Sequence, residues 1–168
     1  MRAVIDPAEL IEGVDEAKKH IFQRVIFWRS RWEEFNPPAG ITWKWKSVPF
    51  SKSSAKSVPD QEHGLYTFIL CPKVAAHPKN HFVLYVGKAD KTSLRQRFQQ
   101  YLQEMKKQKR AQICYALNKY DGYLEFCFTT VQNQGDIAPG EDALILALWP
   151  PLNQQYPASV SHVIHGLR

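Results

Sequence analysis

The stretch that decides the fold runs from His81 to Tyr101 and reads HFVLYVGKADKTSLRQRFQQY. Its first part is an apolar run typical of a buried strand, and this run stops at Gly87. A lysine and a short polar turn follow, and apolar residues then recur at helical spacing over 92–109. This order predicts a strand, a short turn and an amphipathic helix that begins close to the end of the strand.

On both sides of this stretch the sequence changes between strand and helix patterns. Working outward, the patterns predict a helix over 7–35, a strand over 41–48, a polar loop over 51–63, strands over 64–70 and 123–131, and helices over 110–120 and 141–149. From Gly64 on, the order strand, strand, helix, helix, strand, helix predicts an α+β fold. We therefore divide the chain into an N-terminal helix and strand extension (1–63), a core (64–155) and a C-terminal tail (156–168).

Length and composition limit the class of protein. The 168 residues fit one domain, or one domain with an extension, and 44% of them are hydrophobic, enough for a core. No apolar run approaches the roughly 18 residues of a membrane span, and the N-terminus lacks the apolar core of a signal peptide. The three cysteines are scattered and form no CxxC pair, which argues against a zinc site and for reduced thiols. These features predict a cytoplasmic protein.

The positive charge of the chain is concentrated in one segment. The net charge is +6, and residues 88–110 contain eight basic and two acidic residues, so this segment carries the whole excess. A concentrated basic segment favours a polyanion such as DNA as partner. The expected DNA-binding side chains are Lys88, Lys91, Arg95, Arg97, Lys106, Lys107, Lys109 and Arg110. The alternative is a lysine-rich, solvated end of a helix, and charge alone does not separate the two.

Two of the polar positions have ordinary structural explanations when taken singly. Glu141 follows Pro139 and Gly140 at the expected start of the last helix, where a carboxylate is stabilised by roughly 0.3–1 kcal/mol. Asn153 follows a double proline, as turn residues often do. Arg97 faces one edge of the apolar stripe of its helix, whereas an arginine two residues earlier points elsewhere.

Two tripeptides on neighbouring predicted strands change this interpretation. Residues 64–66 read GLY and residues 85–87 read YVG. In this pattern the chain resembles the GIY-YIG nuclease family, which is named for such tripeptides on adjacent strands. The resemblance covers about 64–153, and it implies a small three-stranded antiparallel sheet flanked by helices.

The resemblance extends to five further positions. The family has an arginine early in its first helix, and its metal-binding glutamate lies in the third helix, twelve residues before an asparagine that follows a proline. Arg97, Glu141 and Asn153 fit these positions. Members such as the excision-repair nuclease domain also have a lysine directly after the second tripeptide and a tyrosine four residues beyond the arginine, which Lys88 and Tyr101 match.

The resemblance implies a divalent-metal-dependent DNA endonuclease that hydrolyses phosphodiester bonds of double-stranded DNA. Glu141 would hold Mg²⁺ or Mn²⁺, and Arg97 would stabilise charge on the phosphate. Tyr66 would activate water, with Lys88 and Tyr85 in support. Because a free phenol titrates near ~10, we expect nearby cations to favour the phenolate of Tyr66.

The candidate catalytic residues are therefore Tyr66, Tyr85, Lys88, Arg97, Tyr101, Glu141 and Asn153. The compact chain is similar in build to the restriction enzymes of the family, and a structure-specific repair or recombination nuclease is an alternative. A nucleic-acid-binding module without cleavage, and a non-catalytic scaffold whose tyrosines are core residues, would also be consistent with the sequence. The sequence leaves both a monomer and a homodimer open, and it does not indicate a recognition site.

Overall fold

The computed structural model describes residues 28–72, 74, 80–107 and 111–157. The elements within them, in chain order, are α2 (Arg29–Glu33), β1 (Lys46–Pro49), the 3₁₀-helix η1 (Lys52–Ser57), β2 (Gly64–Leu70), β3 (Phe82–Ala89), α3 (Leu94–Lys107), α4 (Ala111–Lys119), β4 (Leu124–Thr130), the 3₁₀-helix η2 (Gln134–Asp136) and α5 (Ile137–Leu148). Most of the helix expected over 7–35 lies outside the described residues, and α2 covers only its end. The expected adjacency of β2 and β3 and the helices after them are confirmed.

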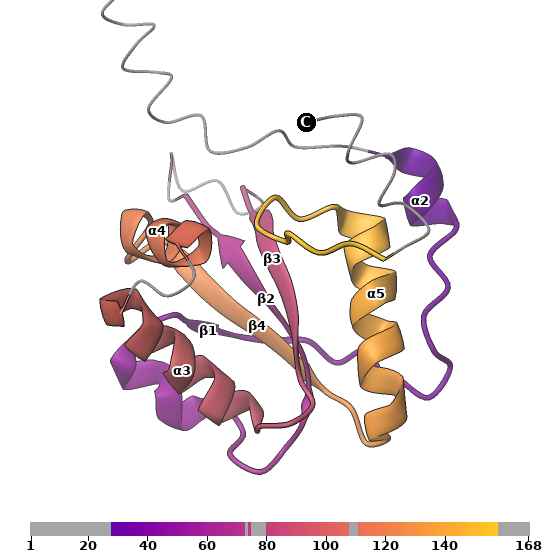
Figure 1. Ribbon diagram of the computed structural model, residues 1–168, viewed down its shortest axis with the longest axis horizontal. Helices are drawn as coiled ribbons and strands as arrows, with labels where there is room; N and C mark the ends of the chain where they lie inside the picture. The colour runs from indigo at the N-terminus through magenta and orange to yellow at the C-terminus, as the bar shows by residue number, and fades with distance from the viewer. Residues whose placement is uncertain (1–27, 73, 75–79, 108–110, 158–168) are drawn as a thin grey trace, which may run out of the picture.

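The four strands in the described part of the chain form one antiparallel sheet in the order β1-β4-β2-β3. Figure 1 shows α3 and α4 on one face of this sheet and α5 on the other. Strand β2 lies between two neighbours, and its side chains alternate between two buried layers. Leu65, for example, packs on the α5 side, whereas the next residue, Tyr66, packs on the side of α3. The α+β class is therefore confirmed.

The expected three-stranded sheet is wrong by one strand. Strand β1 pairs with the outer edge of β4, from Lys46 opposite Phe128 to Pro49 opposite Glu125. The sequence predicted a strand here but assigned it to a separate extension. The edge of β4 that β2 leaves open accepts β1, and Val48 then packs against the main core. Part of the N-terminal extension thus belongs to the same sheet as the core.

The expected polar loop over 51–63 is also more ordered than its composition predicts. It contains η1, and the two apolar residues that flank this 3₁₀-helix, Phe50 and Val58, are buried in the main core. The Ser51 hydroxyl lies within hydrogen-bond distance of the Ser53 and Ser54 hydroxyls, at 2.9 and 3.0 Å. This serine-rich segment satisfies its polar groups locally while its ends are fixed in the core.

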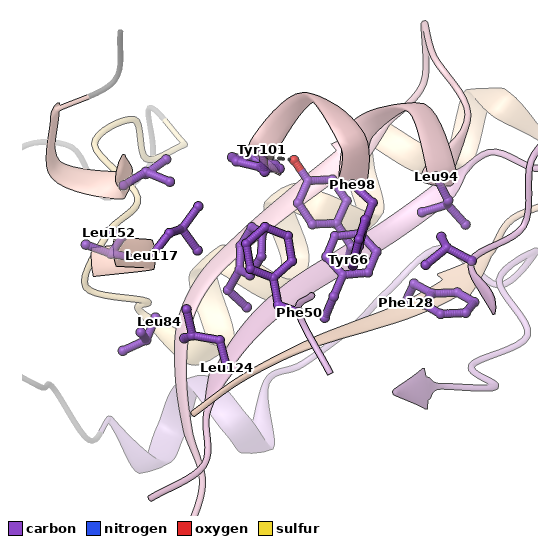
Figure 2. Packing of buried hydrophobic residues seen from close by; sticks show 14 of the residues in the cluster. Phe50, Tyr66, Leu84, Leu94, Phe98, Tyr101, Leu117, Leu124, Phe128 and Leu152 are labelled. Carbon is purple, nitrogen blue, oxygen red and sulfur yellow. Dashed lines mark hydrogen bonds between the residues drawn. The ribbon is translucent and has the colours of Figure 1, made fainter. Parts of the chain in front are cut away.

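Two apolar clusters hold the layers together. The main cluster lies between the sheet and helices α3 and α4 (Figure 2), and several of its aromatic rings meet edge to face, as in the pair of Phe98 and Phe126 at 5.1 Å between centroids. The second cluster lies between the sheet and α5 and includes Val86, Ile137 and Leu144. Each fully buried side chain of this kind contributes about 1.5–3 kcal/mol. Strand β3 is thus fixed from both faces.

Helix α5 begins earlier than the sequence predicts. It starts at Ile137, so Pro139 and Gly140 lie in its first turn instead of before it. Proline is tolerated there because the first-turn N–H groups have no partner within the helix. Glu141 therefore lies in the second turn, and the expected stabilisation by the helix N-terminus is wrong, since that effect falls off within the first turn.

Two expectations from composition bear on the environment of the chain. Cys71, Cys114 and Cys127 are all free thiols, as expected. Within the described residues, the helices are too short or too polar to cross a bilayer.

Candidate active site at the edge strand

Gly87 allows the candidate tyrosines to lie beside the sheet edge. It stands opposite Tyr66 in the pairing of β2 and β3. A Cβ atom at this position would lie 2.5 Å from both Cζ and Oη of Tyr66 and 2.7 Å from Cε1 of Tyr85. Because such contacts are much shorter than van der Waals distance, only glycine leaves room for both rings.

Tyr66 and Tyr101 form a buried pair. Their hydroxyl oxygens are 2.9 Å apart, and Figure 2 shows this hydrogen bond between β2 and α3. The Tyr66 ring also lies over Phe126, with 5.0 Å between centroids, and beside Tyr85, with 6.2 Å. Three of the seven candidate catalytic residues are thus brought together on the α3 side of the sheet.

The expected phenolate of Tyr66 is not supported by its surroundings. Burial raises the pKa of Tyr66 well above its ordinary value near 10, and the neighbouring Tyr101 and Tyr85 raise it further. The Arg97 guanidinium lowers the pKa, but burial outweighs it. Lys88 is not among the groups that act on Tyr66. The nearby Arg97 favours the ionised form, as expected, but Lys88 has no such effect, and burial keeps Tyr66 protonated at neutral pH.

Arg97 lies close to the tyrosines with a donor left over. Its Nη1 donates to Oε1 of Gln100 at 3.1 Å, whereas its Nε is buried and has no hydrogen-bond partner. A buried donor without a partner costs about 1–3 kcal/mol, so the fold alone gives no reason to keep this N–H. A phosphate oxygen would satisfy it, because the guanidinium presents its donors in a planar fork.

Arg95 has a different and structural role. Its Nε donates to the Val58 carbonyl at 2.7 Å, its Nη2 donates to the Lys56 carbonyl at 3.2 Å, and its Nη1 pairs with Asp60 Oδ2 at 3.0 Å. These contacts hold the end of η1 and the residues that follow it, up to Asp60, against α3. All three guanidinium nitrogens are engaged within the fold, and the expected contact of Arg95 with DNA stays a prediction.

Lys88 and Glu141 meet on the opposite side of β3. Lys88 Nζ lies 2.9 Å from Glu141 Oε2, and their side chains are 32% and 15% exposed. Burial raises the pKa of Glu141 although Lys88 opposes the rise, and nearby Asp142 and Asp90 add to it. The hydrogen bond to Glu141 is the largest cause that raises the pKa of Lys88. The 2.9 Å contact is that of an ion pair, with the carboxylate of Glu141 partly removed from water.

Glu141 fits the expected divalent cation only in part. Mg²⁺ is commonly held by one or two carboxylates, with water and phosphate oxygens in the remaining positions. The Glu141 carboxylate is a suitable oxygen donor, but one of its oxygens is paired with Lys88. In the described part of the chain no group of three or more His, Cys, Asp or Glu side chains could hold a metal. The donors therefore suit a cation that is bound together with the phosphate of a substrate.

Asn153 binds the backbone of β3. Its Oδ1 accepts from the Val86 amide at 2.9 Å, and its Nδ2 donates to the Val86 carbonyl at 2.8 Å. The neighbouring Leu152 amide donates to the Leu84 carbonyl at 2.9 Å. Because both ends of the Asn153 side-chain amide are engaged by the strand, we assign this residue to positioning β3 beside Gly87 and not to phosphate binding.

The structure divides the basic segment between the two ends of α3. Lys88 and Lys91 lie before this helix and Arg97 in its first turn. Lys106, which is exposed, is twelve residues from the start of the helix, or about 18 Å along its axis. The side chain of Lys107 and the residues Lys109 and Arg110 lie outside what is described. A continuous basic surface is thus not established for the segment.

Comparison with known proteins does not assign this site. No family model matches the chain, and neither a curated protein nor a solved structure matches it. The resemblance to GIY-YIG nucleases therefore depends on the tripeptides and spacings of the sequence and stays a prediction.

Proposed function

We propose that the chain is a divalent-metal-dependent DNA endonuclease of the GIY-YIG type. The observation that supports this most is that two groups of candidate residues flank strand β3 beside Gly87, one on each face. Tyr66 and Arg97 lie on one face of the strand, and the pair of Lys88 and Glu141 lies on the other. A buried tyrosine cluster alone would be ordinary core. The arginine with a donor left over and the half-buried carboxylate are better explained by chemistry than by packing.

In the proposed enzyme Arg97 binds the phosphate that is cleaved. The side chain would have to turn so that its buried Nε donor meets a phosphoryl oxygen, and its fixed positive charge would stabilise the charge that develops there. The hydroxyls of Tyr66 and Tyr101 are hydrogen-bonded to each other. If this bond is rearranged, one of them can donate a hydrogen bond to a second phosphoryl oxygen. Removal of one such donor typically costs on the order of 10²–10³ in rate.

The pair on the other face contributes charge of both signs. Lys88 is protonated at neutral pH, so it acts as a donor and not as a base. Glu141 would hold Mg²⁺ or Mn²⁺. The cation would supply what the side chains lack, namely a lowered pKa for a bound water and charge for the leaving oxygen. One carboxylate oxygen of Glu141 is already paired with Lys88. The cation would therefore need phosphate oxygens of the substrate as further ligands, so metal binding would depend on substrate.

A second candidate function has one observation in its favour. Tyr66 is 1% exposed, and Glu141 is paired with Lys88, which suits a folded module that binds nucleic acid without cleaving it. Such a module would bind DNA in the presence and absence of metal but would leave it uncut. A restriction-type enzyme and a repair or recombination nuclease would both cut, and they differ in the DNA that they choose.

The test is nicking of a supercoiled plasmid with Mg²⁺ or Mn²⁺, and with chelator as the blank. We expect the wild-type protein to cut only with metal, and Glu141→Gln to lose at least about 10³-fold in rate, since it removes the negative charge. Asp142→Asn, which changes an exposed carboxylate on the next residue of the same helix, should cut as wild type. A Glu141→Gln protein that cuts at the wild-type rate would exclude this site. Binding without cutting by the wild type would favour the second function.

A further inference from the structure

A polar pocket opens at the end of the sheet where β2 begins and β4 ends. Its volume is about 390 Å³, within the range of roughly 300–1,000 Å³ that is typical of ligand sites. The polar side chains that line it are Gln61, Glu62, His63, Thr130, Gln132 and Gln134. The sequence pattern gives none of these residues a role, because they fall at strand ends and turns where polar residues are common.

The walls of this pocket are fixed by hydrogen bonds. The Val131 amide donates to the His63 carbonyl at 3.0 Å, and Nδ1 of His63 lies 3.2 Å from the Ala89 carbonyl. On the other wall, Oδ1 of Asn133 accepts from the Gly135 amide at 3.1 Å, and its Nδ2 donates to Asp136 at 3.2 Å. The turn that carries Gln132 and Gln134 is therefore shaped before any ligand arrives, which lowers the cost of binding.

Three amide side chains in the pocket are not used by the fold. Within the described residues, the side chains of Gln61, Gln132 and Gln134 are exposed and none of them hydrogen-bonds to another residue of the pocket wall. Each offers one acceptor oxygen and two N–H donors, the set with which glutamine pairs with a base edge, most often adenine. The polar lining contains no lysine or arginine, and the carboxylate of Glu62 would repel phosphate. The chemistry therefore suits a neutral ligand rich in donors and acceptors.

We propose that this pocket reads the edge of a nucleobase next to the phosphate that the proposed endonuclease cleaves. The inference rests on the proposed function and adds its specificity-determining residues, with Gln132 and Gln134 in direct contact with the base. DNA sequence is read through base edges, whereas phosphate contacts only position the protein. The pocket would thus recognise the base, and the residues around Gly87 would bind and cleave the phosphate.

The pocket lies close to the candidate site along two elements. Ala89, which His63 contacts, directly follows Lys88 in β3. The turn with Gln134 leads into α5, and Glu141 is four residues from the start of that helix, about 6 Å along its axis. Since successive base pairs are about 3.4 Å apart, the base that is read should lie within about three base pairs of the cut bond.

The experiment is a binding selection from random duplex DNA in the presence of chelator, with sequencing of the bound fraction. It is run on the wild type, on Gln132→Ala, on Gln134→Ala and on the control Gln103→Ala, an exposed glutamine of α3. Unfolding temperature is measured for each variant to verify the fold. Cleavage of the same library with Mg²⁺, followed by end sequencing, locates the preferred base relative to the cut.

We expect the wild type to prefer one base at a defined position and either pocket variant to reduce that preference roughly 5- to 150-fold, the effect of a lost bidentate contact. The Gln103→Ala control should keep the preference. A wild type without base preference, or pocket variants that keep it, would overturn the inference while cleavage could still occur. If the preference shifts in the variants but no protein cuts DNA, the pocket assignment stands and the endonuclease proposal fails.

Discussion

Replacement of Gly87 by alanine should disturb the whole tyrosine cluster. The new methyl group would lie 2.5 Å from the end of the Tyr66 ring, where an ordinary contact needs at least 3.4 Å, so ring or strand must move by about 0.9 Å. Tyr66 has little freedom to move, because it lies over Phe126 and is hydrogen-bonded to Tyr101. Overpacking of this kind costs about 1–3 kcal/mol, and loss of the hydroxyl contact adds about 1 kcal/mol.

The expected total for Gly87→Ala is therefore a loss of about 2–4 kcal/mol in the free energy of unfolding, measured by urea denaturation. For a domain of this size the unfolding temperature should fall by roughly 5–15 °C. Gly135→Ala is a matched control, since a Cβ there would be 3.4 Å from its nearest neighbour and should change stability little. A Gly87→Ala protein within about 0.5 kcal/mol of the wild type would refute the packing described for the site.

Two further predictions concern the charged residues. Arg97→Ala should reduce cleavage in the plasmid-nicking assay by about 10²–10³-fold, with little change in stability. Arg95→Ala should lose about 1–2 kcal/mol in the free energy of unfolding, measured with urea, and keep most of the cleavage rate. The reverse pattern would contradict both assignments. Because the pKa of Glu141 is raised in the folded state, the stability that its protonated form contributes is lost as pH rises above the ordinary carboxylate range. Lys88 opposes that rise in the pKa of Glu141, so the Lys88→Met variant should be less stable than the wild type near neutral pH and should regain stability on acidification. Urea unfolding at several pH values measures this. An equal loss of stability at all pH values would count against the ion pair.

Local patterns predicted the elements around the candidate site well. The strand that contains Gly87 and the helix that follows it depend on neighbours in sequence, so their periodicity is visible, although the strand continues to Ala89 and not only to Gly87. The pairing of β1 with β4 is not visible in the sequence, because it depends on which edge of the sheet remains unpaired after the other strands have folded. The start of α5 was misjudged since Pro139 and Gly140 suit both a turn and a first helical turn.

The sequence predicted which residues belong to the candidate site, but not their protonation or their hydrogen-bond partners. The tripeptides and spacings indicated which side chains to compare, and several of them do gather around β3. The pKa of Tyr66 depends on burial by residues distant in sequence, which no spacing records. The same holds for Asn153, whose amide could have faced solvent or phosphate but is taken up by the Val86 backbone. The pocket glutamines carried no pattern at all.

The contact between Asn153 and Val86 has a consequence for synthesis of the chain. Strand β3 can pair with β2 as soon as both have left the ribosome, but its outer edge waits for a residue 67 positions later. At about 5–20 residues per second, this edge stays open for roughly 3–13 s. An unpaired edge is a template for pairing with another nascent chain. Comparing light scattering by the full chain with that by an Asn153→Ala variant would measure how far Asn153 protects the newly made protein against self-association.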